Sequence, residues 1–255
     1  MAEERRDDGI PGQALTPLVE VSGLSVEFGG IAAVHELTFA VSRCEIVALM
    51  GPNGAGKTTT FHLIAGARQP GSGRIMFDGR DLAGLRPDAR CRLGVARTFQ
   101  ITQPFQELSV TENVMVGAMM HHKRLPDARA AARRYVELVG LADKADAPAK
   151  GLSTGQRKRL ELARAIATRP KLLLMDEVTG GIDQKSIPGM IELVRRLREQ
   201  GLTVIMIEHN MRVIGEVADR AIFMNRGVKI AEGTPADIAR HPDVIDLYLG
   251  DAAHG

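Results

Sequence analysis

The stretch that decides the fold is Gly51-Pro52-Asn53-Gly54-Ala55-Gly56-Lys57-Thr58-Thr59. It matches in full the phosphate-binding pattern G-x-x-x-x-G-K-[ST], with Gly51, Gly56, Lys57 and Thr58 at the fixed positions. Residues 45–50 before it predict a short buried strand, and residues 59–65 after it predict a helix that stops at Gly66. A strand, a glycine loop and a helix in this order predict a nucleotide-binding site.

The residue types suit the binding of a triphosphate. Glycines let the backbone approach the phosphates and adopt positive φ, so that N–H groups face the ligand. The helix that follows adds its unpaired donors and the positive end of its dipole. In this pattern Lys57 reaches the β- and γ-phosphates, and the hydroxyl of Thr58 binds Mg²⁺. The alternative is a glycine-rich turn that matches by accident, and the flanking strand and helix disfavour it.

The composition of the whole chain is that of an ordinary globular protein, 44% apolar and 25% charged. A net charge of +2 gives no argument for or against nucleic acid as a partner. Cys44 and Cys91 do not make a disulfide framework, and no apolar run approaches the roughly 18 residues that a membrane span requires. Residues 1–17 lack the apolar core of a signal peptide, so we expect a disordered leader on a soluble cytoplasmic protein.

The first part of the chain predicts a small antiparallel sheet around the phosphate loop. Strands are expected at residues 18–28, 36–41 and 74–77, separated by glycine turns. Phe28, at the end of the first strand, is a candidate to stack on adenine, since the chain has no Trp and two Tyr. The alternative for Phe28, an aromatic residue of the core, stays open.

Helices dominate from about residue 98 to residue 150, with segments expected at 110–120 and 127–139. The basic residues of this region are typical of a solvated helix face. The adjacent His121 and His122 have no carboxylate or Cys partner at a spacing suited to a metal site.

Residues 152–156, Leu-Ser-Thr-Gly-Gln, open a strongly helical segment. Ser153 and Gln156, three residues apart, form a capping-box pattern, which is a purely structural reading. The same geometry offers an anion a helix N-terminus, a hydroxyl and a glycine backbone. Both readings stay open at this point.

Acidic residues follow an apolar strand at residues 171–175, and a second apolar strand at 203–207 ends in Glu208-His209. Ligands of α/β sheets bind at the carboxyl ends of strands. We therefore expect Asp176 to hold the Mg²⁺ shell and Glu177 to polarise the attacking water. His209 could bond a γ-phosphate, although a lone His is more often structural.

A phosphate loop, an isolated Gln after a strand, L-S-x-G-Q, a strand ending in Asp-Glu and a late His occur here in order. This series resembles the ATPase subunits of ABC transporters, from about residue 18 to residue 250. The resemblance implies an α/β fold, a P-loop NTPase with a RecA-like parallel core sheet, an antiparallel β subdomain and an inserted helical subdomain. Residues 18–98 and 158–250 would form the catalytic core with the β subdomain, and residues 99–157 the helical subdomain, all within a single domain at 18–250.

The resemblance also assigns roles to individual residues. Gly51 to Thr58 would be the Walker A loop, which binds ATP together with Thr59, and Gln100 would be the Q-loop glutamine, both a catalytic residue and a Mg²⁺ ligand. Ser153, Gly155 and Gln156 would be the signature residues that bind ATP. Asp176 and Glu177 would be the Walker B aspartate and the catalytic glutamate. Asp183 would be the D-loop aspartate at the nucleotide, and His209 the switch histidine of catalysis.

Within that family the chain is similar to the ATPases of branched-chain amino acid importers. The similar stretches are residues 28–30, 96–100, 207–211 and 247–250. Two residues depart from the usual pattern: Thr154 stands where Gly or an aromatic residue is usual, and Val178 stands where Pro is usual. The segment between Gln100 and the signature is also short for this group.

The resemblance implies an importer ATPase that uses ATP and Mg²⁺ at the inner face of the cell membrane. Its partners would be a second ATPase subunit, identical or paralogous, separate permease subunits and, indirectly, an extracytoplasmic solute-binding protein. No nucleic acid is expected as a partner. The alternative is a soluble ABC-type ATPase that acts on ribosomes or nucleic acid, but such chains carry two cassettes or a long coiled coil. This chain has one phosphate loop and no sustained heptad pattern.

Overall fold

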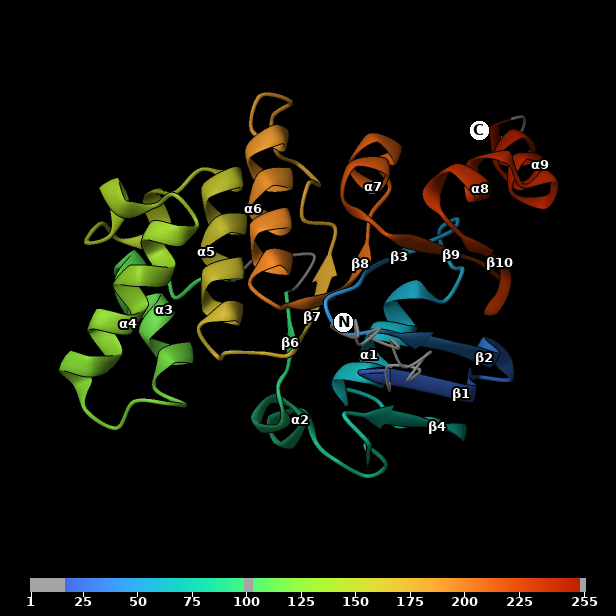
Figure 1. Cartoon of the computed structure of the whole chain (residues 1–255), viewed down its shortest axis with the longest axis horizontal. Helices are drawn as coiled ribbons and strands as arrows, with labels where there is room; N and C mark the ends of the chain where they lie inside the picture. Colours follow the sequence, from blue (N-terminus) through green and yellow to red (C-terminus); the bar gives the residue numbers. More distant parts are fainter. Residues whose placement is uncertain (1–16, 99–102, 253–255) are drawn as a thin grey trace, which may run out of the picture.

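A mixed sheet runs through the middle of the molecule (Figure 1). The structure is a computed structural model, and it describes residues 17–98 and 103–252. In these residues the sheet has six strands in the order β10-β9-β3-β8-β7-β6. All neighbours are parallel except β9 and β10, which form an antiparallel hairpin. The strands are β3 (Ile46–Met50), β6 (Val95–Arg97), β7 (Leu172–Asp176), β8 (Thr203–Ile207), β9 (Arg220–Asn225) and β10 (Val228–Gly233).

Both faces of this sheet are covered, which is why β3, β7 and β8 are apolar and fully buried. Alternate residues serve opposite faces, as in every strand. On one face Ala48 and Met206 belong to a core shared with α5 (Thr154–Ile166), α6 (Ile187–Glu199) and α7 (Met211–Val217). On the other face Leu49 and Ile205 pack with α1 (Lys57–Ala65) and a second sheet.

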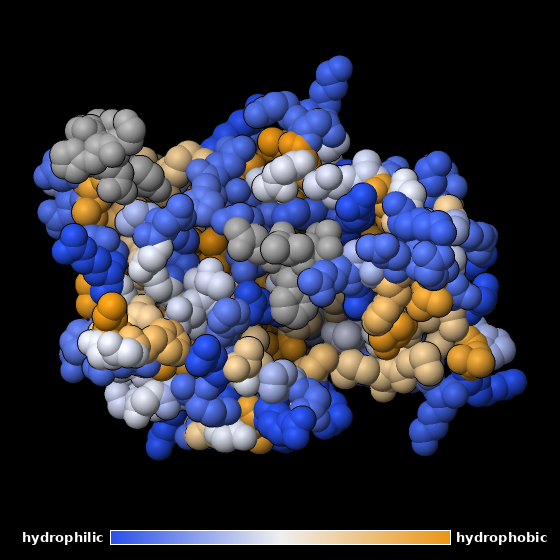
Figure 2. Space-filling view, turned by 180° about the vertical axis from the view of Figure 1, so that it is seen from behind, coloured by the Kyte–Doolittle hydropathy of each residue, from blue (hydrophilic) through white to orange (hydrophobic). Residues whose placement is uncertain are grey.

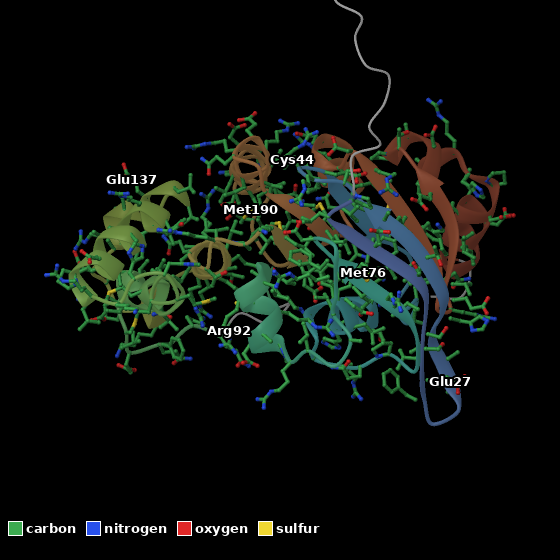
Figure 3. All side chains as sticks on the ribbon, turned by 60° about the horizontal axis from the view of Figure 1, so that its bottom comes forward. Glu27, Cys44, Met76, Arg92, Glu137 and Met190 are labelled. Atoms are coloured by element: carbon green, nitrogen blue, oxygen red, sulfur yellow. The ribbon has the colours of Figure 1, made fainter. Side chains whose placement is uncertain are left out.

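The second sheet is antiparallel and has the order β2-β1-β4-β5 in the described residues. Its strands are β1 (Val19–Phe28), β2 (Ile31–Val41), β4 (Ser72–Phe77) and β5 (Arg80–Asp81). Gly29 and Gly30 both have positive φ, 57° and 83°, as a two-residue hairpin turn requires. Because this turn lets Phe28 pair with Ile31, β2 begins five residues earlier than the expected start at residue 36. The hairpin projects from the body of the molecule, with Glu27 near its tip (Figure 3).

The helical end consists of α3 (Val110–Ala118), α4 (Leu125–Leu138) and α5. A methyl group on Gly117 of α3 would lie 2.5 Å from the carbonyl oxygen of Arg164 on α5, so the absence of a side chain lets these two helices approach closely. The core of this end is continuous with the core on one face of the central sheet. Glu137 on α4 and Glu27 on the hairpin mark opposite ends of the molecule (Figure 3).

Arg90, in α2 (Pro87–Leu93), fixes the far end of the helix that follows the phosphate loop. The side chain is 1% exposed, and it donates to the carbonyl oxygens of Leu63 and Ile64 in α1 at 2.6 and 2.9 Å. It also donates to those of Leu82 and Leu85, at 2.8 and 3.0 Å. Burial lowers the pKa of this guanidinium below its usual value. A buried cation surrounded by carbonyl oxygens thus replaces the water that the end of α1 would otherwise bind.

The predicted fold class is confirmed: an α/β core with a largely parallel sheet, an antiparallel β layer and a helical end. Two further helices, α8 (Pro235–Arg240) and α9 (Pro242–Ala252), follow β10. Residues 1–16 of the predicted leader and Gln100 lie outside the described residues. The predicted boundaries at 98/99 and 157/158 stay predictions. Among the described residues, every helix is too short or too polar to cross a membrane.

Candidate nucleotide-binding and hydrolysis site

The phosphate loop joins β3 to α1, and its glycines are required by both conformation and space. Gly51 and Gly56 have φ values of 138° and 98°. A methyl group on Gly51 would lie 2.0 Å from the carbonyl oxygen of Met224, and one on Gly56 would lie 2.4 Å from that of Ala33. Gly54, with φ of 81°, has open space around it and is required for conformation alone. The loop is therefore wedged between β9 and β2, which leaves little room for it to move.

Lys57 is buried and curls over the loop. Its Nζ donates to the carbonyl oxygens of Gly51 and Pro52 at 2.7 and 2.8 Å. Burial lowers the pKa of this ammonium, while the negative charges of Glu177 and Asp176 act in the opposite direction. The cation thus lies over the loop with the two acidic residues close enough to act on it. Of the other loop residues, Ala55 is buried, Pro52 and Thr59 are half-buried, and Asn53 and Gly54 are exposed.

A hollow of about 870 Å³ begins at Thr58, Arg97 and Asp176. Asp176, at the end of β7, is 2% exposed, and Arg97 on the neighbouring β6 donates to its Oδ2 at 2.9 Å. The hydroxyl of Thr98 accepts a bond from the backbone N–H of Asp176 at 3.1 Å. Arg97 therefore holds the carboxylate of Asp176 at the hollow, and Thr98, which directly follows β6, holds its backbone.

The oxygen atoms of Thr58 and Asp176 fit a magnesium ion. Mg²⁺ prefers oxygen ligands and usually takes one or two carboxylates together with waters and substrate phosphates. In the described residues, no group of three or more His, Cys, Asp or Glu side chains could hold a metal ion. A site with one hydroxyl and one carboxylate agrees with a metal that arrives with its phosphate ligands.

Glu177 and His209, predicted from two separate strands, are brought together by the parallel pairing of β7 and β8. The Oε1 of Glu177 and the Nε2 of His209 are 3.0 Å apart. Glu177 is half-buried, and its backbone has φ of 48°, in the left-handed region that few residues other than glycine adopt. The next residue, Val178, is buried. A carboxylate oriented by an imidazole is a suitable acceptor for the proton of an attacking water.

The signature residues form the predicted capping box at the start of α5. Ser153 Oγ accepts from the backbone N–H of Gln156 at 3.3 Å, and Gln156 Oε1 accepts from that of Ser153 at 3.0 Å. Ser153, Gly155 and Gln156 do not line the hollow at Thr58 and Asp176. Thr154, at one of the two departures from the usual pattern, is exposed. Within one chain, therefore, the start of α5 and the phosphate hollow are separate surfaces.

The segment around Asp183 lies beside the start of α5. A methyl group placed on Gly155 would lie 3.6 Å from Cγ2 of Ile182. Asp183 is exposed and accepts from the backbone N–H and the hydroxyl of Ser186 at 3.0 and 2.8 Å, which lowers the pKa of its carboxyl. Both predicted nucleotide contacts, Gly155 and Asp183, thus belong to one outward-facing surface.

Phe28 is not a core residue, so that alternative was wrong. Its side chain is 38% exposed at the end of β1, because the hairpin carries it away from both packed layers. The guanidinium carbon of Arg68 lies 4.7 Å from the centre of its ring. The ring is available at the surface, and its role in stacking on adenine stays a prediction.

From Asp176 the hollow extends along α5 to an apolar end between α3 and α5, where Phe105, Val116 and Met120 line it. These three side chains are exposed, and Figure 2 shows apolar surface over this end of the molecule. Arg164 on α5 lines the hollow and contacts Phe105 at its apolar end. It donates to the carbonyl oxygen of Gln103 at 3.0 Å and lies over the ring of Phe105, 4.9 Å from its centre.

Comparison with known proteins agrees with this geometry. Residues 34–180 match the ABC transporter family. The chain belongs to that family. Residues 228–254 match a second family described as "Branched-chain amino acid ATP-binding cassette transporter". The resemblance predicted from the order of the motifs is confirmed, and the chain is an ATPase of the ABC transporter type.

Individual relatives share nearly the full length of this ABC ATPase. It is 37% identical to the high-affinity branched-chain amino acid transport ATP-binding protein BraF of Pseudomonas aeruginosa, and the alignment covers 92% of this chain and 99% of BraF. LivG of Escherichia coli, also named as a high-affinity branched-chain amino acid transport ATP-binding protein, is 37% identical with the same coverage. Among solved structures, the ADP conformation of MJ1267 superposes with a TM-score of 0.84 at 27% identity, covering 92% of this chain and 99% of MJ1267.

Three residues of the ABC ATPase site received no role from the sequence. Arg97 pairs with Asp176, Lys158 donates to the carbonyl oxygen of Glu177, and Glu208 accepts from backbone N–H groups beside His209. Glu208 has a recognisable signal, because it follows a buried strand at the ligand-binding edge of the sheet. Nothing in the spacing of Arg97 or Lys158 points to these contacts.

Proposed function

We propose that this chain is the ATP-hydrolysing subunit of an importer of branched-chain amino acids, and that two ATPase subunits act as a head-to-tail pair. The observation that carries the pairing is the separation within one chain of two groups of predicted ATP-binding residues. Thr58 and Asp176 line the phosphate hollow, and Lys57 and Glu177 are their neighbours in the chain, whereas Ser153 and Gly155 do not line it. A second subunit that presents its α5 N-terminus to the nucleotide would complete the site.

In this arrangement Lys57 and the loop N–H groups bind the phosphates of ATP, while Thr58 and Asp176 hold Mg²⁺. The metal, when bound, neutralises phosphate charge and orients the γ-phosphate. Glu177 orients the attacking water and accepts its proton, and His209 holds the carboxylate of Glu177 in place and can bond the γ-phosphate. Loss of that phosphate removes the contact of the partner's helix N-terminus, so the pair opens after hydrolysis.

The apolar end of the hollow would receive a segment of a membrane-spanning permease subunit at the inner face of the membrane. Phe105, Val116 and Met120 offer it an exposed apolar surface. This surface is continuous with the hollow at Asp176, so a permease segment bound there can sense the nucleotide through α5 and Arg164. A solute-binding protein outside the cell would select the solute, and nucleic acid has no part in this function.

Three measurements test the proposal. Affinity capture of the chain from native membranes should recover multi-span chains, and deletion of its gene should reduce uptake of labelled leucine, isoleucine and valine. Capture of ribosomal or DNA-bound proteins without a membrane chain would instead support the soluble ABC ATPase.

The pairing of two subunits has its own test. Glu177→Gln incubated with Mg-ATP should elute from a size-exclusion column at twice the monomer mass, and a monomer under all nucleotide conditions would contradict the pairing.

The docking surface has a matched control. Val116→Asp should abolish co-purification with the permease while the isolated subunit still binds ATP. Leu125→Asp changes a more exposed apolar residue that does not line the hollow, so it should keep the permease. If both variants retain the permease, the groove between α3 and α5 is not the docking surface.

A further inference from the structure

The backbone of Glu177 must be held in place by its surroundings. With φ of 48°, it occupies a region that is strained for a residue with a side chain. Its N–H donates to the carbonyl oxygen of Ile207 at 2.9 Å, and its own carbonyl oxygen accepts from the N–H of Gly180 at 3.0 Å. The resulting turn, residues 177–180, connects β7 to the segment that contains Asp183. Whatever shifts this turn also shifts the carboxylate of Glu177, which lies 3.0 Å from Nε2 of His209.

Lys158 holds one side of this turn. It lies on α5 and is only 8% exposed, and its Nζ donates to the carbonyl oxygen of Glu177 at 2.5 Å. Burying an ammonium group costs free energy unless its N–H groups form hydrogen bonds. It is unusual for a charged side chain to be buried in order to bond a backbone carbonyl oxygen. Lys158 lies on the helix that Ser153 caps, little more than one turn from Ser153 and about half a turn from Gln156.

Glu208 holds the other side. Its carboxylate is 4% exposed and lies directly after β8. Its Oε2 accepts from the N–H of Thr179 in the turn at 3.3 Å. Its Oε1 accepts from the N–H groups of His209 and Asn210 at 3.1 and 3.3 Å. One buried carboxylate therefore connects the turn of Glu177 to the segment that carries His209.

We propose that Lys158 and Glu208 are positioning residues that clamp the 177–180 turn and set the geometry between Glu177 and His209. This inference rests on the proposed catalytic role of Glu177. Lys158 also makes the position of Glu177 depend on α5, the helix that presents Ser153 to the partner's nucleotide. Closure of one ATP site thereby adjusts the catalytic carboxylate of the other, through one hydrogen bond within a single subunit.

The test compares kcat and KM of the full chain with its folding. Lys158→Met and Glu208→Gln should each lower kcat at least ~10-fold, since small displacements of a catalytic group cost rate, while KM and the Kd of Mg-ATP stay within about two-fold. Lys158→Arg, which keeps a charged donor, should restore most of kcat. The controls Lys150→Met and Glu199→Gln remove exposed charges away from the turn and should leave kcat unchanged.

A double-mutant comparison separates positioning from a general structural role. If Lys158 acts through Glu177, Lys158→Met should change the residual hydrolysis of Glu177→Gln by less than about two-fold. A loss in that background as large as in the wild type would overturn the proposal. So would a kcat within about two-fold of wild type for both Lys158→Met and Glu208→Gln while Glu177→Gln is inactive.

Two other outcomes are distinguishable. Removal of a buried charge can prevent folding, so a second pair of variants is needed. Lys158→Gln keeps a donor and Glu208→Asp keeps a carboxylate. Both should lower kcat while the affinity for Mg-ATP is unchanged. Normal hydrolysis by Glu177→Gln itself would remove Glu177 as the catalytic base, and the clamp with it. The first result concerns only the clamp, whereas the second contradicts the proposed function of the site.

Discussion

At the carboxyl ends of β7 and β8, Asp176 and Glu208 are buried and bonded to groups from other parts of the chain. At the start of α5, Ser153 and Gln156 are bonded to each other and face outward. The named contacts of Asp176 and Glu208 lie within one subunit, so the geometry of the first region depends on tertiary contacts. The second is locally self-sufficient, so its structure would be the same with or without a function. The difference teaches that the polar groups at the edge of the sheet can be judged from this chain, whereas a role of the start of α5 in binding ATP is a proposal that only a measurement of hydrolysis can test.

The strongest test of the sheet edge is Glu177→Gln. A general base contributes about 10²- to 10⁴-fold to a rate, so phosphate release should fall by that order while Mg-ATP still binds. A phosphate-release assay and a titration with a fluorescent ATP analogue measure the two quantities. Glu199→Gln is the control, because it removes an exposed glutamate from α6. Near-normal turnover in Glu177→Gln would remove this residue as the catalytic base.

Lys57→Ala tests the phosphate loop of the same region. A hydrogen bond to a charged group contributes about 1.5–3 kcal/mol, so the loss of one such contact should weaken ATP binding by roughly 10- to 150-fold. The affinity for the fluorescent analogue measures this change, and Lys150→Ala, an exposed lysine before α5, provides the control. Unchanged affinity would mean that Lys57 serves only to close the loop through Gly51 and Pro52.

The start of α5 has an internal control, because Ser109 and Glu112 form a second capping box at the start of α3. Ser153→Ala and Ser109→Ala should each cost about 1 kcal/mol of stability, visible as similar decreases in melting temperature. Loss of a donor to a transition-state phosphate costs more, so Ser153→Ala alone should also lower hydrolysis at least ~10-fold. If the two variants hydrolyse ATP equally well, Ser153 is a helix cap and nothing more.

The smallest expected effect is at Phe28, which lies outside both regions. An aromatic stacking contact contributes about 0.5–1.5 kcal/mol, so Phe28→Ala should weaken ATP binding only a few-fold, and Phe28→Trp should preserve it. Equal affinity of the three proteins for ATP would remove Phe28 from the nucleotide site. In that case the contact between its ring and the guanidinium of Arg68 would have a structural role.

Much of the site could be predicted because its signals are local. Backbone conformation requires Gly51 and Gly56, and the geometry of a helix start requires Ser153 and Gln156. Both patterns can therefore be recognised from a few consecutive residues. Asp176, Glu177 and His209 were predicted from buried strands that end in polar residues. Their meeting follows from the parallel order of β7 and β8, which only the fold establishes.

The sequence by itself determined the nucleotide loop, the α/β class, the polar strand ends and the capping box of α5, and its ordered motifs identified the family. The tertiary structure alone decided that Arg97 pairs with Asp176, that Lys158 and Glu208 hold the turn of Glu177, and that Phe28 is at the surface. The physical reason is distance along the chain. Helix caps and glycine turns form hydrogen bonds with groups only a few residues away in the chain. A buried charged side chain instead bonds groups of whichever segment the packed core places beside it.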